Sequence, residues 1–126
     1  MAGRPKAGEI WVARIVDDMR MMNGKEQIKI KSRPVLILSD GIQIAEIDVN
    51  AAKITSNSAR NQFDIAIEDW ETAGLDKPSV IRISKQTHFH YTFCTKYIGE
   101  LAPKDKLKVA ETLKAFNDSV ESEWLP

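Results

Sequence analysis

Over the first hundred residues, apolar and polar side chains alternate in short stretches separated by turn-forming residues. The stretch FDIAIE (63–68) shows this clearly, because Phe63, Ile65 and Ile67 fall on one face of an extended chain. Such alternation, rich in β-branched and aromatic residues, is typical of β-strands. Strands are predicted at 9–16, in part of 28–38, at 42–55 as one or two strands with a break, at 63–68, 79–84, 88–93 and 95–101.

The segments between these strands have the composition of loops and turns. Residues 17–27 show no period and contain Asn-Gly, which predicts a long loop. Ser-Asp-Gly at 39–41 indicates a turn, and 56–62 a polar loop. Residues 69–75 resemble a single helical turn that ends at Gly74.

The C-terminal segment has a different period. From Pro103 onward, apolar residues recur at helical spacing, which predicts an amphipathic helix of about five turns. They are Leu107, Ala110, Leu113, Phe116 and Val120. Many short strands followed by one helix predict a mainly β, α+β fold, a small and strongly curved antiparallel sheet or barrel with the helix packed across it. We expect one domain over 1–126, with its core at roughly 8–117.

Composition agrees with a small globular protein. The chain has 126 residues, 43% of them hydrophobic, which suits one domain with a genuine core. No apolar run approaches the ~18 residues that span a bilayer, and the N-terminus lacks the apolar region of a secretory signal. A single cysteine, Cys94, predicts a reduced cytoplasmic protein and a packed thiol, not a nucleophile.

Charge is balanced overall but unevenly distributed. Residues 1–33 hold eight Lys/Arg against four Asp/Glu, residues 34–76 hold two against eight, and residues 77–126 hold eight against six. A neutral total gives no general attraction to nucleic acid. A local basic surface requires that the first third of the chain and the strand around Arg82 meet in space.

Arg33 is the first candidate for chemistry. It stands between the basic, polar KIKS (29–32) and the apolar PVLIL (34–38). It either marks the rim of the core, with its apolar stem covering the rim, or is held there to bind an anion. Thr55 and Ser56 end a predicted strand, where their hydroxyls either bind a phosphate or satisfy a turn.

The two histidines, His88 and His90, lie on one side of HFHYTF (88–93), opposite Phe89, Tyr91 and Phe93. Two ligands do not close a metal site. We expect exposed or interface histidines, with a role in RNA handling as the alternative, and we expect neither a metal nor a cofactor.

Five motifs in order resemble the PemK/MazF toxins of type II toxin–antitoxin systems. They are GEIW (8–11), RPVLILS (33–39), KITS (53–56), AGLDKPSVIRIS (73–84) and YIGEL (97–101). The resemblance extends from Gly8 to about Phe116. It implies an SH3-like β-barrel with added helices, a homodimer, and cleavage of single-stranded RNA without a metal. It also implies an antitoxin whose disordered acidic C-terminal segment occupies the RNA groove.

The resemblance also implies roles for particular residues. Arg33 matches the arginine of the family's RP motif, and Thr55 follows in the family order, so both are candidate catalytic residues. Candidate RNA-binding residues are Glu9, Ser56, Arg82, Ser84, Lys85 and Gln86. The expected reaction is attack of the RNA 2′-hydroxyl on phosphorus to give a 2′,3′-cyclic phosphate. Arg33, always charged, suits the transition state and not the role of base.

The chain departs from the family pattern at three places. Ser84 stands where some members have an aspartate two residues after the position of Arg82, and a histidine of the first loop is absent. The expected loop is longer and carries Met19, Met21 and Met22, which form either a flexible apolar flap, an antitoxin-docking surface or a segment packed on the barrel. These departures leave the general base open. They also leave two alternative functions open. One is a non-catalytic module that binds nucleic acid or a peptide, and the other is a toxin that acts on another target.

Overall fold

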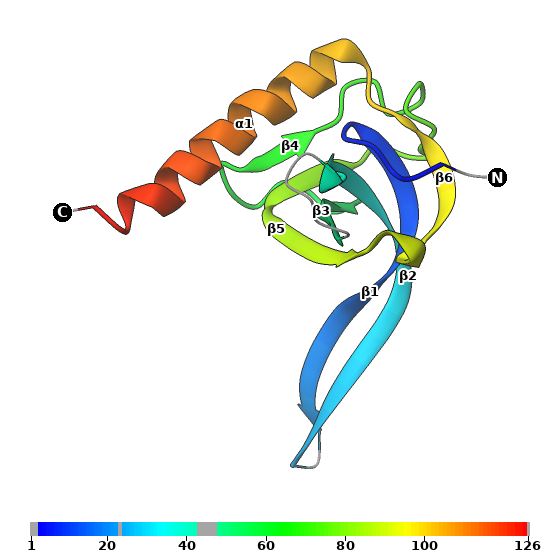
Figure 1. Cartoon of the computed structure of the whole chain (residues 1–126), viewed down its shortest axis with the longest axis vertical. Helices are drawn as coiled ribbons and strands as arrows, with labels where there is room; N and C mark the ends of the chain where they lie inside the picture. The colour runs from blue at the N-terminus through cyan, green and yellow to red at the C-terminus, as the bar shows by residue number, and fades with distance from the viewer. Residues whose placement is uncertain (1–2, 23, 43–47, 126) are drawn as a thin grey trace.

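The computed structural model describes residues 3–22, 24–42 and 48–125, and for 17–22 the backbone alone. Six strands and one long helix follow one another along the chain (Figure 1). They are β1 (Glu9–Met22), β2 (Lys25–Ser39), β3 (Asp48–Thr55), β4 (Asp64–Ala66), β5 (Val80–His90), a 3₁₀ turn η2 (Tyr91–Phe93), β6 (Cys94–Glu100) and α1 (Pro103–Ser122). The predicted mainly β fold with a C-terminal helix is confirmed.

The strands form one antiparallel sheet in the order β4-β5-β3-β2-β1-β6. The sheet is strongly curved, and η2 carries the chain from β5 to β6, the strand at the opposite edge (Figure 1). Its edge strands, β4 and β6, are not neighbours in the sheet, so the predicted barrel is open.

Both faces of the central strands are buried. Neighbouring residues of one strand therefore enter different cores, as Ile10 and Trp11 do on β1 and Val35 and Leu36 do on β2. The first core contains Ile10, Leu36, Ala52, Ile54, Ile65, Ile67, Ala73, Ile81, Ile83 and Leu101. The second contains Trp11, Ala13, Ile15, Val35, Ile37, Val49 and Ala51, with Phe89 and Cys94 packed against it. Burial on both faces explains why 35–38 reads as a continuous apolar run.

The predicted long loop over 17–27 is wrong, because β1 and β2 continue through it as a paired hairpin. Pairing extends to Met22 opposite Lys25, which leaves a two-residue connection of Asn-Gly type. This arm projects from the rest of the sheet (Figure 1). Beyond the bulge that follows Val16, the side chains that are described lie on β2, and Ile28 and Ile30 among them are exposed. The described residues of the arm therefore show no buried face, and backbone pairing between β1 and β2 defines the hairpin.

The predicted methionine loop is corrected by the same hairpin. Met19, Met21 and Met22 lie within β1 and not in a loop. Their side chains lie outside the described part of the structure, so the three alternatives for them remain predictions.

Other strand boundaries differ from the prediction by a few residues. β4 is restricted to Asp64–Ala66, and β5 runs on to His90, where a 3₁₀ turn replaces the predicted alternation over 91–93. Within 42–55 the structure describes a strand from Asp48, while 43–47 lie outside the described residues. The polar loop over 56–62 and the turn at 39–41 are confirmed.

The turn at 69–75 is confirmed and lies against the edge strand β6. The Ala73 amide donates to the Asp69 carbonyl, and Gly74 has a φ of 90°. A Cβ on Gly99 of β6 would lie 2.2 Å from the Ala73 carbonyl oxygen, so this close approach requires glycine.

The helix α1 is confirmed, but it is rotated from the predicted face. Val109, Leu113 and Phe116 pack on the first core, whereas the predicted contact residue Leu107 is 61% exposed. The reason is Asp105, which is fully buried and accepts hydrogen bonds from the amides of Glu68 and Asp69, each at 3.0 Å. Among the described residues, no helix is both long enough and apolar enough to cross a bilayer.

Replacing the carboxylate of Asp105 is expected to weaken the fold. In Asp105→Asn one amide would lose its acceptor, and a charge-assisted hydrogen bond would be lost, so the free energy of unfolding should fall by about 2 kcal/mol. Urea denaturation followed by circular dichroism measures this. The matched control is Asp118→Asn, which removes an exposed ion pair with Lys114 and should leave stability nearly unchanged. Equal stability of Asp105→Asn and wild type would contradict the role assigned to Asp105.

Cys94 is expected to react slowly with alkylating reagents. Burial against the second core raises the pKa of its thiol to about 11. At pH 8 the reactive thiolate is then on the order of 100-fold rarer than for a free cysteine. The rate should rise about tenfold per pH unit up to about pH 11, as measured by mass spectrometry with iodoacetamide. The urea-unfolded chain should react at the rate of a free thiol, and an equally fast rate in the folded protein would argue against a packed thiol.

Candidate functional site

A cavity of about 550 Å³ opens where β2, β3 and β5 meet the loop that precedes β5. Its lining is contributed by strand ends and by residues that follow or precede strands. The lining residues are Ile15, Arg33, Pro34, Lys53, Ile54, Thr55, Ser56, Asn57, Leu75, Asp76, Lys77, Ser79 and Arg82. Ile15 also belongs to the second core, so the cavity lies where that core ends.

The sheet register brings the cations of this cavity together. Lys53 on β3 lies directly opposite Arg82 on β5, and Arg82 lies directly opposite Asp64 on β4. On its other side Lys53 pairs with Val35 of β2. Paired residues of an antiparallel sheet project to the same face. Lys53 and Arg82 therefore project to the face that holds the second core, of which Val35 is a member.

Arg33 and Thr55 lie on the same face, each two residues away from the Val35–Lys53 pair. Arg33 precedes Val35 by two residues, and Thr55 follows Lys53 by two, so on antiparallel strands both are displaced in the same direction. The Thr55 Oγ1 accepts a hydrogen bond from the Asn57 amide at 3.1 Å. The predicted turn role of this hydroxyl is thus confirmed, while the residue also lines the cavity.

The cavity is cationic. Arg33, Lys53, Lys77 and Arg82 line it, against one carboxylate among the described lining residues, that of Asp76. Clustered cations in a concave site concentrate anions. Hydroxyl groups from Thr55 and Ser56 stand beside them. The combination of guanidinium, ammonium and hydroxyl donors suits a phosphate or carboxylate ligand.

The cavity brings together four of the residues predicted from sequence, namely Arg33, Thr55, Ser56 and Arg82. A local basic surface required that the first third of the chain meet the strand of Arg82. Arg33 and Arg82 do line one cavity, so the two parts meet here.

Four other predicted residues do not line this cavity. Glu9 accepts hydrogen bonds from the Lys6 amide and the Trp11 indole, six residues along β1 from Ile15. Ser84 accepts one from the Asn61 side chain, and Gln86 bonds Asn50 and the Ile83 carbonyl. Lys85 is exposed on β5, within the irregular stretch 83–85 that has no paired residue on β3. Their RNA-binding roles stay predictions.

Sequence reasoning missed Lys53, Asn57, Asp76 and Lys77. The signal for Lys53 was present, since it precedes Thr55 by two residues and so shares its face of a strand. No comparable signal existed for 76–77, because their position depends on how the loop before β5 folds over the strand ends.

The histidines have structural surroundings. His90 Nδ1 accepts from the Thr92 amide at 3.2 Å and its ring stacks on Tyr91, which fixes the η2 turn. His88 is exposed opposite Asn50. Within the described ranges, no group of three His, Cys, Asp or Glu side chains is arranged to hold a metal ion.

Comparison with known structures places the fold among toxins. The Deinococcus radiodurans MazF (Form-I) aligns with a TM-score of 0.68 and 14% identity, covering 93% of this chain and 99% of that chain. The Mycobacterium tuberculosis toxin MazF-mt6 gives 0.64 and 23%, covering 86% and 96%. An endoribonuclease in complex with its cognate antitoxin from Mycobacterial species gives 0.61 and 16%, covering 97% of each chain.

No curated protein shows significant sequence similarity to the chain. The family model described as PemK-like, MazF-like toxin of type II toxin-antitoxin system matches residues 6–116. That match includes every strand, the whole cationic cavity and the part of α1 that packs on the sheet. The chain therefore belongs to the family of PemK-like, MazF-like toxins of type II toxin–antitoxin systems.

Proposed function

We propose that the protein is a metal-independent endoribonuclease that cleaves single-stranded RNA as the toxin of a type II toxin–antitoxin pair. The observation that carries the proposal is the cavity that Arg33, Lys53 and Arg82 line together with Thr55 and Ser56. A phosphodiester has the charge and the acceptor oxygens that this set of donors requires. Solved neighbours described as endoribonucleases share the fold.

The proposed reaction uses the RNA's own nucleophile. The 2′-hydroxyl loses its proton and attacks the adjacent phosphorus, the bond from phosphorus to the 5′-oxygen breaks, and that oxygen takes up a proton. The products are a 2′,3′-cyclic phosphate and a 5′-hydroxyl. Arg33 and Arg82 stabilise the charge that builds on the phosphorane oxygens. Thr55 donates its hydroxyl hydrogen to a phosphate oxygen, which is compatible with its acceptance of the Asn57 amide.

Proton transfer needs a base near the 2′-hydroxyl. Asp76 is the one carboxylate among the described residues of the cavity lining, and we assign it this role. In Asp76→Asn the single-turnover cleavage rate should fall without a comparable loss of RNA binding. An unchanged cleavage rate would remove Asp76 from the mechanism.

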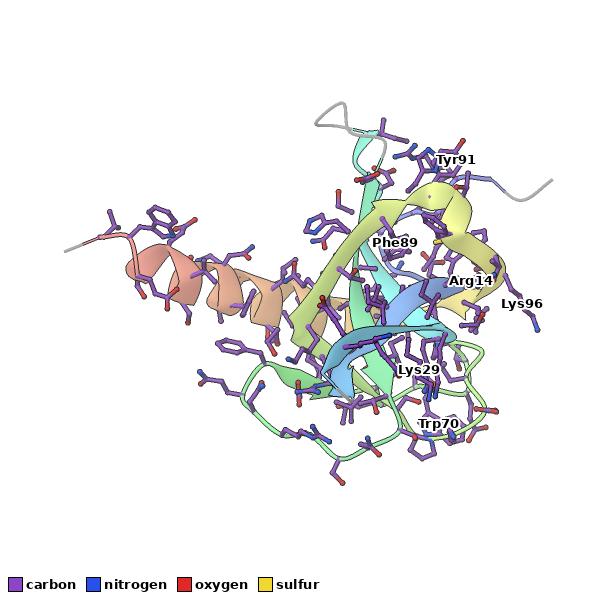
Figure 2. The ribbon with its side chains drawn as sticks, turned by 90° about the horizontal axis from the view of Figure 1, so that it is seen from below. Arg14, Lys29, Trp70, Phe89, Tyr91 and Lys96 are labelled. Carbon is purple, nitrogen blue, oxygen red and sulfur yellow. The ribbon has the colours of Figure 1, made fainter. Side chains whose placement is uncertain are left out.

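The β1–β2 arm supports a path for the RNA strand beyond the cavity. Lys29, Lys31 and Arg33 stand at every second position of β2, so the three cations share one face of this strand, from the arm to the cavity. Lys29 is seen on this arm in Figure 2. A row of cations leading from a cationic cavity fits a phosphate backbone, because neutralised phosphates release counterions.

Two partners belong to the proposal. One is an antitoxin whose acidic, disordered C-terminal segment occupies the cationic cavity and so excludes RNA. Solved complexes of MazE with MazF, and of an endoribonuclease with its cognate antitoxin, share this fold. The other partner is a second copy of the chain. Within 88–93 Tyr91 and Phe93 are exposed, as are the apolar residues Val120, Trp124 and Leu125 at and after the end of α1, and a second copy would cover these surfaces.

The central prediction concerns Arg33. Wild-type protein should cut a varied single-stranded RNA pool in EDTA, and Arg33→Ala should lower the single-turnover rate by about 100-fold or more, the scale of losing one preorganised donor. Thr55→Ala should also lower it. Urea denaturation should show that both variants remain folded. Lys114→Ala, on the exposed side of α1, is the matched loss of a cation away from the cavity and should cut normally.

Two results would contradict the proposed mechanism: undiminished cutting by Arg33→Ala, or a strict need for Mg²⁺. Wild-type protein that binds RNA or a peptide but never cuts the pool would support the non-catalytic binding module instead.

The proposed dimer has its own measurement. Light scattering at micromolar concentration should give twice the 14.2 kDa mass of one chain. Charged replacements in the exposed apolar end of α1, such as Val120→Lys, should lower the measured mass if that surface is covered by the second copy. A monomeric mass for the wild type would contradict the dimer.

A further inference from the structure

We infer that Asp64 is a positioning residue, which holds the Arg82 guanidinium by its Nε so that the terminal nitrogens serve the phosphate in the cavity. The inference deepens the proposed function and rests on it. Asp64 does not line the cavity. It acts on the ligand only through Arg82.

The geometry of the pair is set by the sheet. Asp64 lies on β4 directly opposite Arg82 on β5, so both side chains project to one face. The Asp64 Oδ1 is 3.5 Å from the Arg82 Nε. The other carboxylate oxygen, Oδ2, accepts the Arg60 amide at 2.7 Å. One oxygen is thus anchored to the backbone, and the second faces the guanidinium.

Burial makes this carboxylate unusual. The Asp64 side chain has no exposed surface, and that of Arg82 is 18% exposed. Removing a carboxylate from water is costly, and the cost is met only if its oxygens find donors. Asp105, which is also buried, accepts hydrogen bonds from two backbone amides. Asp64 accepts a hydrogen bond from one backbone amide through Oδ2, and its Oδ1 faces Arg82, a cation of the cavity. A positioning role requires this arrangement.

The contact leaves the outer edge of the guanidinium to the cavity. All described interactions of Arg82 with Asp64 run through Nε. The two terminal nitrogens have no partner within the described part of the chain, and Arg82 lines the cavity. That outer edge is a planar pair of donors of the kind that binds two phosphate oxygens.

Asp64 also offsets repulsion between two cations. Lys53 lies directly opposite Arg82 on the other side, and like charges in directly opposed positions disfavour pairing. A carboxylate on the third strand completes an acid–cation–cation row across β4, β5 and β3. It therefore helps both cations remain at the cavity when no phosphate is bound.

The test is a double-mutant cycle on single-turnover RNA cleavage in EDTA, with the whole chain. We expect Asp64→Asn to lower the rate by about 10- to 100-fold and Arg82→Ala by at least as much. The double variant should be no slower than Arg82→Ala, because residues that act through one another are not additive. In an Arg82→Lys background, which lacks Nε, Asp64→Asn should have no further effect.

Asp105→Asn is the matched control, since it changes a second buried acid that accepts backbone amides. It should cost stability while leaving the rate per folded molecule unchanged. Rates are therefore compared per folded molecule, with the folded fraction taken from urea denaturation. A merely structural role for Asp64 would give the same pattern as Asp105→Asn.

The outcomes separate the two proposals. The positioning inference is overturned, and the proposed function stands, if wild type cuts RNA and Asp64→Asn cuts it equally well. The same holds if the rate loss of the double variant equals the product of the losses of the two single variants. If wild type does not cut RNA, the proposed function fails. The affinities of wild type, the two single variants and the double variant for a 2′-deoxy-substituted RNA strand are then measured instead. Coupling between Asp64 and Arg82 in that binding would support positioning, and its absence would overturn it.

Discussion

The structure depends on the burial of both faces of β1, β2 and β3. Successive residues of these strands enter two different cores, as Val35 and Leu36 show. A shift of one residue in the pairing would exchange the two sets and would also move Lys53 into the first core. The register is therefore strongly specified. The same register places Lys53, Arg82 and Asp64 in one row across three strands.

The cavity lies where that double burial ends. Ile15 is buried and Val16 is exposed, and on β2 the arm residues 25–30 are exposed. Polar residues at these strand ends gain rigid backbone support from the sheet while their side chains stay accessible. A bulge at residues 83–85 of β5 changes the β3–β5 register next to the cationic row, between the pairs Ala52–Gln86 and Lys53–Arg82. Bulges re-aim side chains in this way beside functional sites.

Sequence reasoning identified much of the fold and about half of the site. It placed Arg33, Thr55, Ser56 and Arg82 as candidates, and the structure brings these four to one cavity. It failed for the hairpin arm, because the exposed residues 25–30 of β2 carry no burial pattern. It also misjudged the face of α1, because an apolar period does not reveal that Asp105 is buried to satisfy two amides. Asp64 was not among the candidates, because the alternation over 63–68 marks only Phe63, Ile65 and Ile67 as one face of a strand.

By itself, the sequence determined the succession of strands and helix, the apolar run of β2, the cation that precedes it and the membership of a toxin family. These features are local, since they follow from periodicity, turn chemistry and motifs in order. Only the tertiary structure decided which charges share a face, because that depends on the pairing of strands distant in sequence. Asp64, Arg82 and Lys53 are near one another only through β4, β5 and β3. Asp76 and Lys77 come from the loop before β5 and line the same cavity as Lys53 and Arg82. Long-range packing places this loop at the strand ends, so no local sequence pattern could reveal its position.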